Sequence, residues 1–188
     1  IAVAWHILSK CGLTENTTLL LNSIGTSECR SAYREALKHF LEPHLNDLSE
    51  TSRKRLHHNP LRILDTKNEK ERSLLKDAPE IADYYSKDDK KHLEEVKDFL
   101  SAMDIPFTIN PRLVRGLDYY TKTVFEITSS DLGSQDALLG GGRYDDLVEN
   151  LGGKPTPGIG FAAGMERILL LINEKQQKAN KPSPDIYF

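Results

Sequence analysis

Several features that would place a protein in a specialised class are missing from this sequence. Its two cysteines, Cys11 and Cys29, are too few for a disulfide framework and are not spaced as zinc ligands, so we expect reduced thiols in a cytoplasmic protein. None of the six histidines belongs to a metal-ligand motif, so no metal site is expected. The longest apolar runs are far shorter than a membrane span, and no signal-peptide pattern opens the chain. The sequence therefore predicts no membrane association.

Net charge and composition exclude a strongly basic nucleic-acid-binding protein. The formal net charge is −3, which gives no overall attraction to nucleic acid, so any contact with RNA must come from local patches. A hydrophobic content of 38% and a charged content of 28% are ordinary for a globular protein. The length of 188 residues allows one or two domains with a sizeable core.

The composition changes twice along the chain. Residues 27–104 contain no glycine, are rich in charge, and repeat their apolar residues at helical spacing. The chain has strand character on both sides of this segment, and neither side has enough strands to cover a core alone. We therefore expect residues 1–26 and 105–178 to form one sheet-containing domain, into which residues 27–104 are inserted as a helical unit.

Residues 117–128 are dense in Tyr, Thr, Val, Phe and Ile and lack glycine and proline, which predicts a strand. Because side chains alternate along a strand, one face would carry Tyr120, Lys122, Val124 and Glu126, and the other Tyr119, Thr121, Thr123, Phe125 and Ile127. At the strand entrance, Arg115 precedes Gly116, whose backbone freedom allows a guanidinium to be presented there. This arrangement is suited to holding an anion, although an amphipathic strand with an exposed arginine is the simpler interpretation.

Two later segments are also rich in glycine. An apolar strand is predicted to run into three glycines at 140–142, and a short helix is expected to start at Asp145. Residues 158–164 predict a strand of small residues that leads into an apolar helix. Arg167 lies in the first turn of that helix, where backbone N–H groups and the helix dipole favour an anion. A glycine turn and a solvated arginine would explain each feature alone, but together with Arg115 they favour a phosphate site.

Three motifs follow one another in this half of the chain: Leu113–Tyr120, Gly141–Asp145 and Gly160–Arg167. The first two resemble the histidine-specific signatures of histidyl-tRNA synthetases of the bacterial type. The third resembles motif 3 of class II aminoacyl-tRNA synthetases. Residues 21–25 and 59–65 are also similar to that family, so the resemblance covers nearly the whole chain.

The resemblance implies an α+β fold. In that family a largely antiparallel sheet flanked by helices forms the class II catalytic core, and an all-helical insertion domain lies between motifs 2 and 3. Motif 1, which makes the family's dimer interface, and motif 2 are not found, so we expect an internal fragment that is inactive alone and does not form the family's homodimer. Residues 179–188 are similar to the linker and first strand of an anticodon-binding domain.

The resemblance also implies an activity. Members of the family use ATP to convert histidine into histidyl-adenylate and then transfer the histidyl group to tRNA(His), and Mg²⁺ is expected at the phosphates. Both steps develop charge at a fixed centre, which requires positioned cations more than a general base. The implied partners are therefore histidine, ATP and tRNA(His).

Residue roles carry over to the positions that match the motifs. Arg115 corresponds to the signature arginine, which is catalytic and contacts both the α-phosphate of ATP and the carboxylate of histidine. The other histidine-binding positions would be Tyr119, Tyr120, Tyr144, Gly141 and Gly142. The other ATP-binding positions would be Gly160, Gly164 and Arg167, with Arg167 on the γ-phosphate. The sequence departs from many relatives at Asp146, where they have a small residue.

Other functions are less well supported by the sequence. Arg53, Lys54 and Arg55 form a basic cluster that gives a weak prediction of tRNA contact, but residues 27–104 count 15 Lys and Arg against 17 Asp and Glu, and a solvated helix face explains the cluster equally well. The main alternative is a synthetase-like regulatory or histidine-binding subunit that does not charge tRNA. Such paralogues typically lose the signature arginine and tyrosines, which are present here. A simple RNA-binding fragment would depend on the basic cluster alone.

Overall fold

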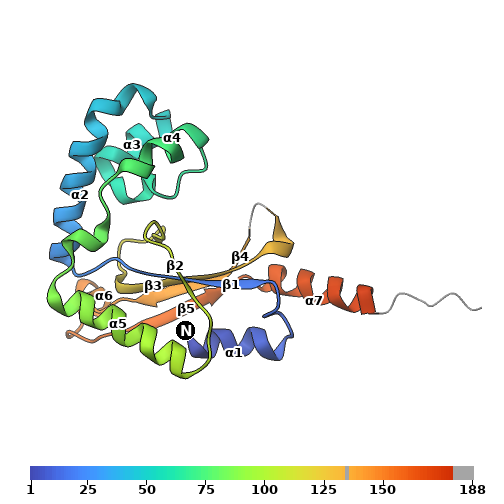
Figure 1. The fold of residues 1–188 in the computed structure, drawn as a ribbon. Helices are drawn as coiled ribbons and strands as arrows, with labels where there is room; N and C mark the ends of the chain where they lie inside the picture. The colour runs from blue at the N-terminus through green and yellow to red at the C-terminus, as the bar shows by residue number, and fades with distance from the viewer. Residues whose placement is uncertain (134–135, 180–188) are drawn as a thin grey trace, which may run out of the picture.

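A five-stranded sheet in the order β2-β1-β3-β4-β5 organises the computed structural model, which describes residues 1–133 and 136–179 (Figure 1). The strands are β1 (Thr17–Ser23), β2 (Thr108–Ile109), β3 (Thr121–Ser129), β4 (Ala137–Arg143) and β5 (Ile159–Ala163). Only the pairing of β1 with β2 is parallel, and the other three pairings are antiparallel. The prediction of an α+β fold with a largely antiparallel sheet is confirmed.

Helices occupy most of the rest of the chain. The α-helices are α1 (Ala2–Lys10), α2 (Ser27–Leu41), α3 (Glu50–His58), α4 (Glu69–Leu74), α5 (Lys87–Ala102), α6 (Leu147–Asn150) and α7 (Met165–Ala179). Short 3-10 helices are η1 (Glu42–Asp47), η2 (Pro60–Ile63), η3 (Leu75–Asp77), η4 (Ile81–Tyr84) and η5 (Ser130–Leu132). Within the described residues, no helix combines the length and apolar character needed to cross a membrane. Of the linker expected at residues 179–188, residues 180–188 lie outside the described part of the chain.

One face of the sheet packs against α1 and α5, which lie beneath it in Figure 1. Alternate residues of the strands enter this core, as expected for strands with one face buried on helices. The core contains Ala4, Leu8, Leu13, Leu19, Leu21, Leu100, Ile105, Phe125, Ile127, Leu138, Leu139, Ile168 and Leu171. Because α5 contributes Leu100 here, with Leu93 and Val96 packed against it, the last helix of the predicted insertion covers the sheet.

A second core lies on the opposite face and is built mainly from α2 and the short helices that follow it. Tyr33 and Leu37 of α2 and Ile63 of η2 are its buried centre, and Val124 of β3 joins it from the sheet. The helices α2, α3 and α4 stand apart from α1 and α5 in Figure 1. That residues 27–104 form a separate domain stays a prediction. Because α5 packs on the sheet, we propose that the inserted unit ends before α5.

The strand predicted at 117–128 begins at Thr121 and is irregular at Lys122. Lys122 has a φ of 52°, and the pairing of β3 with β4 shifts register between Thr121 and Val124. Beyond this bulge the predicted alternation holds: Val124 packs in the second core, whereas Phe125 is buried against α1 and α5. Tyr119 and Tyr120 therefore lie on the loop that precedes the strand.

The three glycines at 140–142 continue the predicted strand and do not form the glycine turn that was the simpler interpretation. Gly140, Gly141 and Gly142 are all inside β4, paired to β3 on one side and β5 on the other. The helix expected from Asp145 begins two residues later, at Leu147. The backbone N–H of Asp145 instead donates to the hydroxyl of Thr121 (3.0 Å), which holds this residue outside the helix.

Candidate active site

Two glycines of β4 create a floor on which larger side chains lie. A Cβ atom at Gly140 would be 2.6 Å from both terminal nitrogens of the Arg115 guanidinium. A Cβ atom at Gly142 would be 2.9 Å from the ring of Tyr120. With Arg115 and Tyr120 in these positions neither glycine leaves room for a side chain, so the glycines allow both residues to lie directly on the strand. Together with Gly160 of β5, which pairs with Gly142, they form what we call the glycine face.

Tyr144 lies over the neighbouring strand of this floor. A Cβ atom at Gly160 would be 2.6 Å from its hydroxyl oxygen, and one at Gly158 would be 2.5 Å from its ring. The backbone N–H of Tyr144 donates to the carbonyl of Gly158 (2.7 Å), which fixes the residue just after β4 ends. The tyrosine ring therefore lies over Gly160 of β5 and over Gly158, which immediately precedes that strand.

Three tyrosine rings gather above the glycine face. The ring centroids of Tyr119 and Tyr120 are 4.5 Å apart, and that of Tyr144 lies 5.7 Å from the first and 6.3 Å from the second. The contacts of Tyr144 with the other two rings are edge-on, the geometry that aromatic pairs favour. The structure thus brings together all three tyrosines that the sequence predicts for histidine binding. Their rings and hydroxyls suit a flat, polar ligand such as an imidazole.

The guanidinium of Arg115 forms an ion pair with the carboxylate of Glu126, which points from β3 onto the same face. Glu126 pairs with Gly140 across the strands, so the charged pair lies on that glycine. The side chains of Arg115 and Glu126 are 24% and 23% exposed, which leaves the pair accessible to a ligand. The site therefore presents a cation and an anion side by side.

Arg115 also acts on the tyrosine cluster. Burial raises the pKa of Tyr120 to about 12, and a hydrogen bond with the hydroxyl of Tyr119 adds to the rise. The positive charge of Arg115 opposes this rise in the pKa. Tyr120 consequently stays protonated at neutral pH and can donate a hydrogen bond.

Arg167 and Gly164 lie at the other end of the floor. Arg167 is in the first turn of α7, where its guanidinium donates to the carbonyl of Ala137 at the start of β4. Gly164 donates its N–H to Leu138 (2.8 Å). Since Ala137 and Gly140 are three residues apart on one strand, the Arg167 and Arg115 anchor points are separated by about 10 Å. The two predicted phosphate contacts are thus spaced along β4, and their role in ATP binding stays a prediction.

Gly141 has a different position from the other predicted glycines. It pairs with Phe125 of β3 and Phe161 of β5, both of which face α1 and α5. A Cβ atom there would overlap the carbonyl oxygen of Gly160. Its structural requirement is therefore the close packing of β4 on β5, and contact with histidine stays a prediction for this residue.

The predicted tRNA-contact cluster lies on α3, within the helical segment (Figure 1). Each of its members has a local partner. The side chain of Arg53 donates to the carbonyl of Leu48, Lys54 to the carboxylate of Glu50, and Arg55 to the carbonyl of Arg62. These contacts do not distinguish a tRNA-binding surface from an ordinary helix face, so the contact with tRNA stays a prediction.

Glu126 and Gly140 are site residues that the sequence reasoning did not assign. A signal existed for Glu126, because strand alternation places it on the same face as Tyr120 and Val124. For Gly140 the sequence offers only its membership of a glycine run, and the register with β3 is needed to choose it over Gly141. In residues 1–133 and 136–179, no group of three or more His, Cys, Asp or Glu side chains is arranged to hold a metal.

The largely antiparallel sheet and the helices around it match the catalytic region of a class II aminoacyl-tRNA synthetase. A family model described as histidyl-tRNA synthetase matches residues 8–168. The chain belongs to the histidyl-tRNA synthetase family, as its motifs predict.

Relatives agree with this family over nearly the whole chain. A histidine–tRNA ligase of Wolbachia pipientis wMel is 51% identical over 173 residues, which are 92% of this chain and 42% of that protein. A histidine–tRNA ligase of Synechococcus sp. (strain JA-3-3Ab) is 50% identical over 187 residues, 100% of this chain and 44% of that protein. The crystal structure of apo S. aureus histidyl-tRNA synthetase matches with a TM-score of 0.72 and 38% identity, over 93% of this chain and 42% of that one. The chain thus spans less than half the length of these relatives.

Proposed function

We propose that the complete protein is a histidine–tRNA ligase, which activates histidine with ATP and transfers it to tRNA(His) in the cytoplasm. The observation that carries this proposal is the position of Arg115 on Gly140, beside Glu126 and the three tyrosines. Relatives that are 50–51% identical over this region carry the name of that activity. A homodimer of the complete protein is a further expectation from the family.

The charged pair and the tyrosine rings of the site would bind histidine for its activation. A free amino acid carries a carboxylate and an ammonium group, and the pair of Arg115 and Glu126 offers each of them an opposite charge. The three tyrosine rings would hold the imidazole, with the hydroxyl of Tyr144 as a hydrogen-bonding group. When the carboxylate oxygen attacks the α-phosphate, negative charge develops at phosphorus and pyrophosphate leaves. Arg115 would stabilise that charge without reorganising, because it is already fixed on the strand.

Arg167 would act on the leaving group. Its place in the first turn of α7 lets the guanidinium and the helix N-terminus favour the same anion. Mg²⁺ is held mainly by substrate phosphates and one or two carboxylates in many nucleotide sites. The described residues contain no group of three or more His, Cys, Asp or Glu side chains that could hold the ion by themselves.

Histidine-dependent exchange of labelled pyrophosphate into ATP tests the proposed function. The complete protein should catalyse the exchange with histidine and should then charge tRNA(His). A regulatory or histidine-binding subunit would bind histidine and give neither exchange nor charging. Absence of exchange in the folded complete protein would contradict the proposal.

Removal of one hydroxyl tests the assignment of the histidine pocket. Tyr144→Phe keeps the ring on Gly158 and Gly160, so the fold should be unchanged. A polar group of the ligand left without its partner costs roughly 1–3 kcal/mol, so the KM for histidine should rise by about 5- to 150-fold, with a much smaller change for ATP. Separate KM measurements in the exchange assay decide this. Equal weakening of both substrates, or of neither, would remove Tyr144 from the imidazole pocket.

A further inference from the structure

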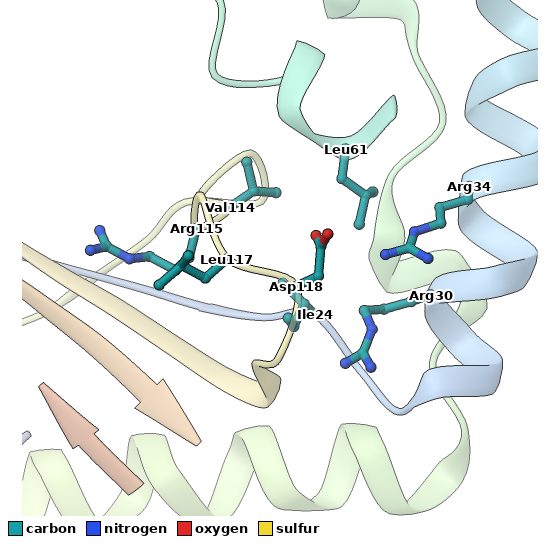
Figure 2. A pocket seen from close by; sticks show the side chains of 8 residues that line it. All are labelled: Ile24, Arg30, Arg34, Leu61, Val114, Arg115, Leu117 and Asp118. Atoms are coloured by element: carbon teal, nitrogen blue, oxygen red, sulfur yellow. The ribbon is translucent and has the colours of Figure 1, made fainter. Parts of the chain in front are cut away.

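Two arginines of α2 reach the junction between the helical segment and the loop that carries the tyrosines (Figure 2). Arg30 and Arg34 are one turn apart on the helix, so they share a face. Arg30 is only 8% exposed, and its guanidinium donates to the backbone carbonyl of Tyr120 (2.6 Å) and, at 3.4 Å, to that of Gly25. A buried cation on the helical segment is thus bonded to the backbone of a pocket residue.

Asp118, from the loop before β3, lines the same small cavity as Arg30. Burial and the charge of Arg34 lower the pKa of Arg30, whereas Asp146 and Asp118 act in the opposite direction. Asp118 lies beside Tyr119 in the chain, and Asp146 follows Tyr144 by two residues. The helical segment makes a second contact with the loop that carries Tyr119 and Tyr120, because the side-chain amide of Asn59 donates to the carboxylate of Asp118.

The space between these groups is too small for a ligand. The cavity lined by Arg30, Arg34 and Asp118 has a volume of about 20 Å³, which is enough for about one water molecule. One terminal nitrogen of Arg30, Nη1, already donates to two backbone carbonyls. The arrangement therefore acts on the neighbouring loop and does not form a binding site of its own.

We propose that Arg30 is a positioning residue that holds the Tyr120 backbone, so that the helical segment sets the shape of the histidine pocket without touching substrate. The inference rests on the proposed function, because the pocket it shapes is the one assigned to histidine. If Arg30 releases Tyr120, that ring loses its fixed place on Gly142 and beside Tyr119. Histidine binding should then weaken more than ATP binding, since the predicted phosphate contact at Arg167 lies at the far end of β4.

Steady-state pyrophosphate exchange by the complete protein tests this inference. Arg30→Met should raise the KM for histidine by about tenfold or more, because a buried carbonyl loses a charged donor, and should change the KM for ATP by less than about threefold. Arg30→Lys keeps a charged donor and should recover part of the loss. Arg72→Met is the matched control: it removes an arginine of the same helical segment that is 61% exposed in an ion pair with Glu69, and should leave both constants unchanged.

A second variant keeps the test decisive if Arg30→Met does not fold. Asn59→Ala removes the exposed hydrogen bond with Asp118, and should raise the KM for histidine about three- to tenfold at an unchanged melting temperature. The inference is overturned if Arg30→Met and Asn59→Ala both bind histidine normally, or if both substrates weaken equally. Lack of exchange in the unmodified protein would instead contradict the proposed function, so the two failures are distinguishable.

Discussion

Replacing Arg115 by alanine is expected to lower the rate of histidine-dependent pyrophosphate exchange by the complete protein by a factor on the order of 10²–10³. This is the usual loss when one preorganised donor is removed from a developing charge. The fold should be unaffected, because the side chain is partly exposed and its partner Glu126 can reach water once the guanidinium is gone. Measured melting temperatures of the two proteins should agree within a few degrees.

Lysine at this position separates charge from geometry. The Arg115 guanidinium lies over Gly140 and donates to Glu126, and its planar fork keeps further donors for a ligand in a fixed geometry that a single ammonium cannot reproduce. Arg115→Lys should therefore recover only a small part of the lost exchange. Near-normal exchange in the alanine variant would show that the charge at phosphorus is stabilised elsewhere, and would remove Arg115 from the catalytic role.

Adding a methyl group at Gly140 should lower the rate of pyrophosphate exchange nearly as much as removing the Arg115 side chain. Gly140→Ala places a Cβ atom where the Arg115 guanidinium lies, 2.6 Å from its nitrogens. The guanidinium is the free end of a flexible side chain, so it can move away at little cost in stability. We expect exchange to fall by a factor on the order of 10–10², since the donor is displaced without being removed. Denaturant unfolding should give a stability close to that of the unmodified protein.

The neighbouring glycine provides the matched control. Gly141→Ala directs its Cβ atom at the backbone of Gly160, which cannot rotate away as a side chain can. Overpacking of this kind costs about 1–3 kcal/mol or more, so this variant should lose stability through the pairing of β4 with β5. The contrast would fail if Gly140→Ala unfolded the protein, or if it kept full exchange with the guanidinium displaced.

Much of the fold could be predicted because its signals are local. Strand alternation correctly separated Val124 and Glu126 from Phe125 and Ile127, and the glycine-rich segments correctly predicted β4 and β5. The bulge at Lys122 could not be predicted, because local sequence does not favour a positive φ at a lysine and the register shift with β4 is a tertiary feature. The position of α5 under the sheet was missed for a similar reason. Its amphipathic pattern is the same whichever core it faces.

The candidate site shows the same division. Motifs identified Arg115 and the three tyrosines, which the fold brings together above two adjacent strands. Gly140 could not be selected within its glycine run, because one step of register decides which glycine lies under the arginine. Arg30 had no signal at all: two arginines at helical spacing are typical of a solvated face. Only the tertiary structure shows that Arg30 is buried and bonded to Tyr120.

A crystal structure of the complete protein with a stable analogue of histidyl-adenylate tests the central claim most directly. The account predicts that the imidazole lies among Tyr119, Tyr120 and Tyr144, and that the Arg115 guanidinium contacts the phosphorus-bearing group above Gly140. An analogue bound against the α1 and α5 face of the sheet, or one that leaves Arg115 engaged only with Glu126, would contradict it.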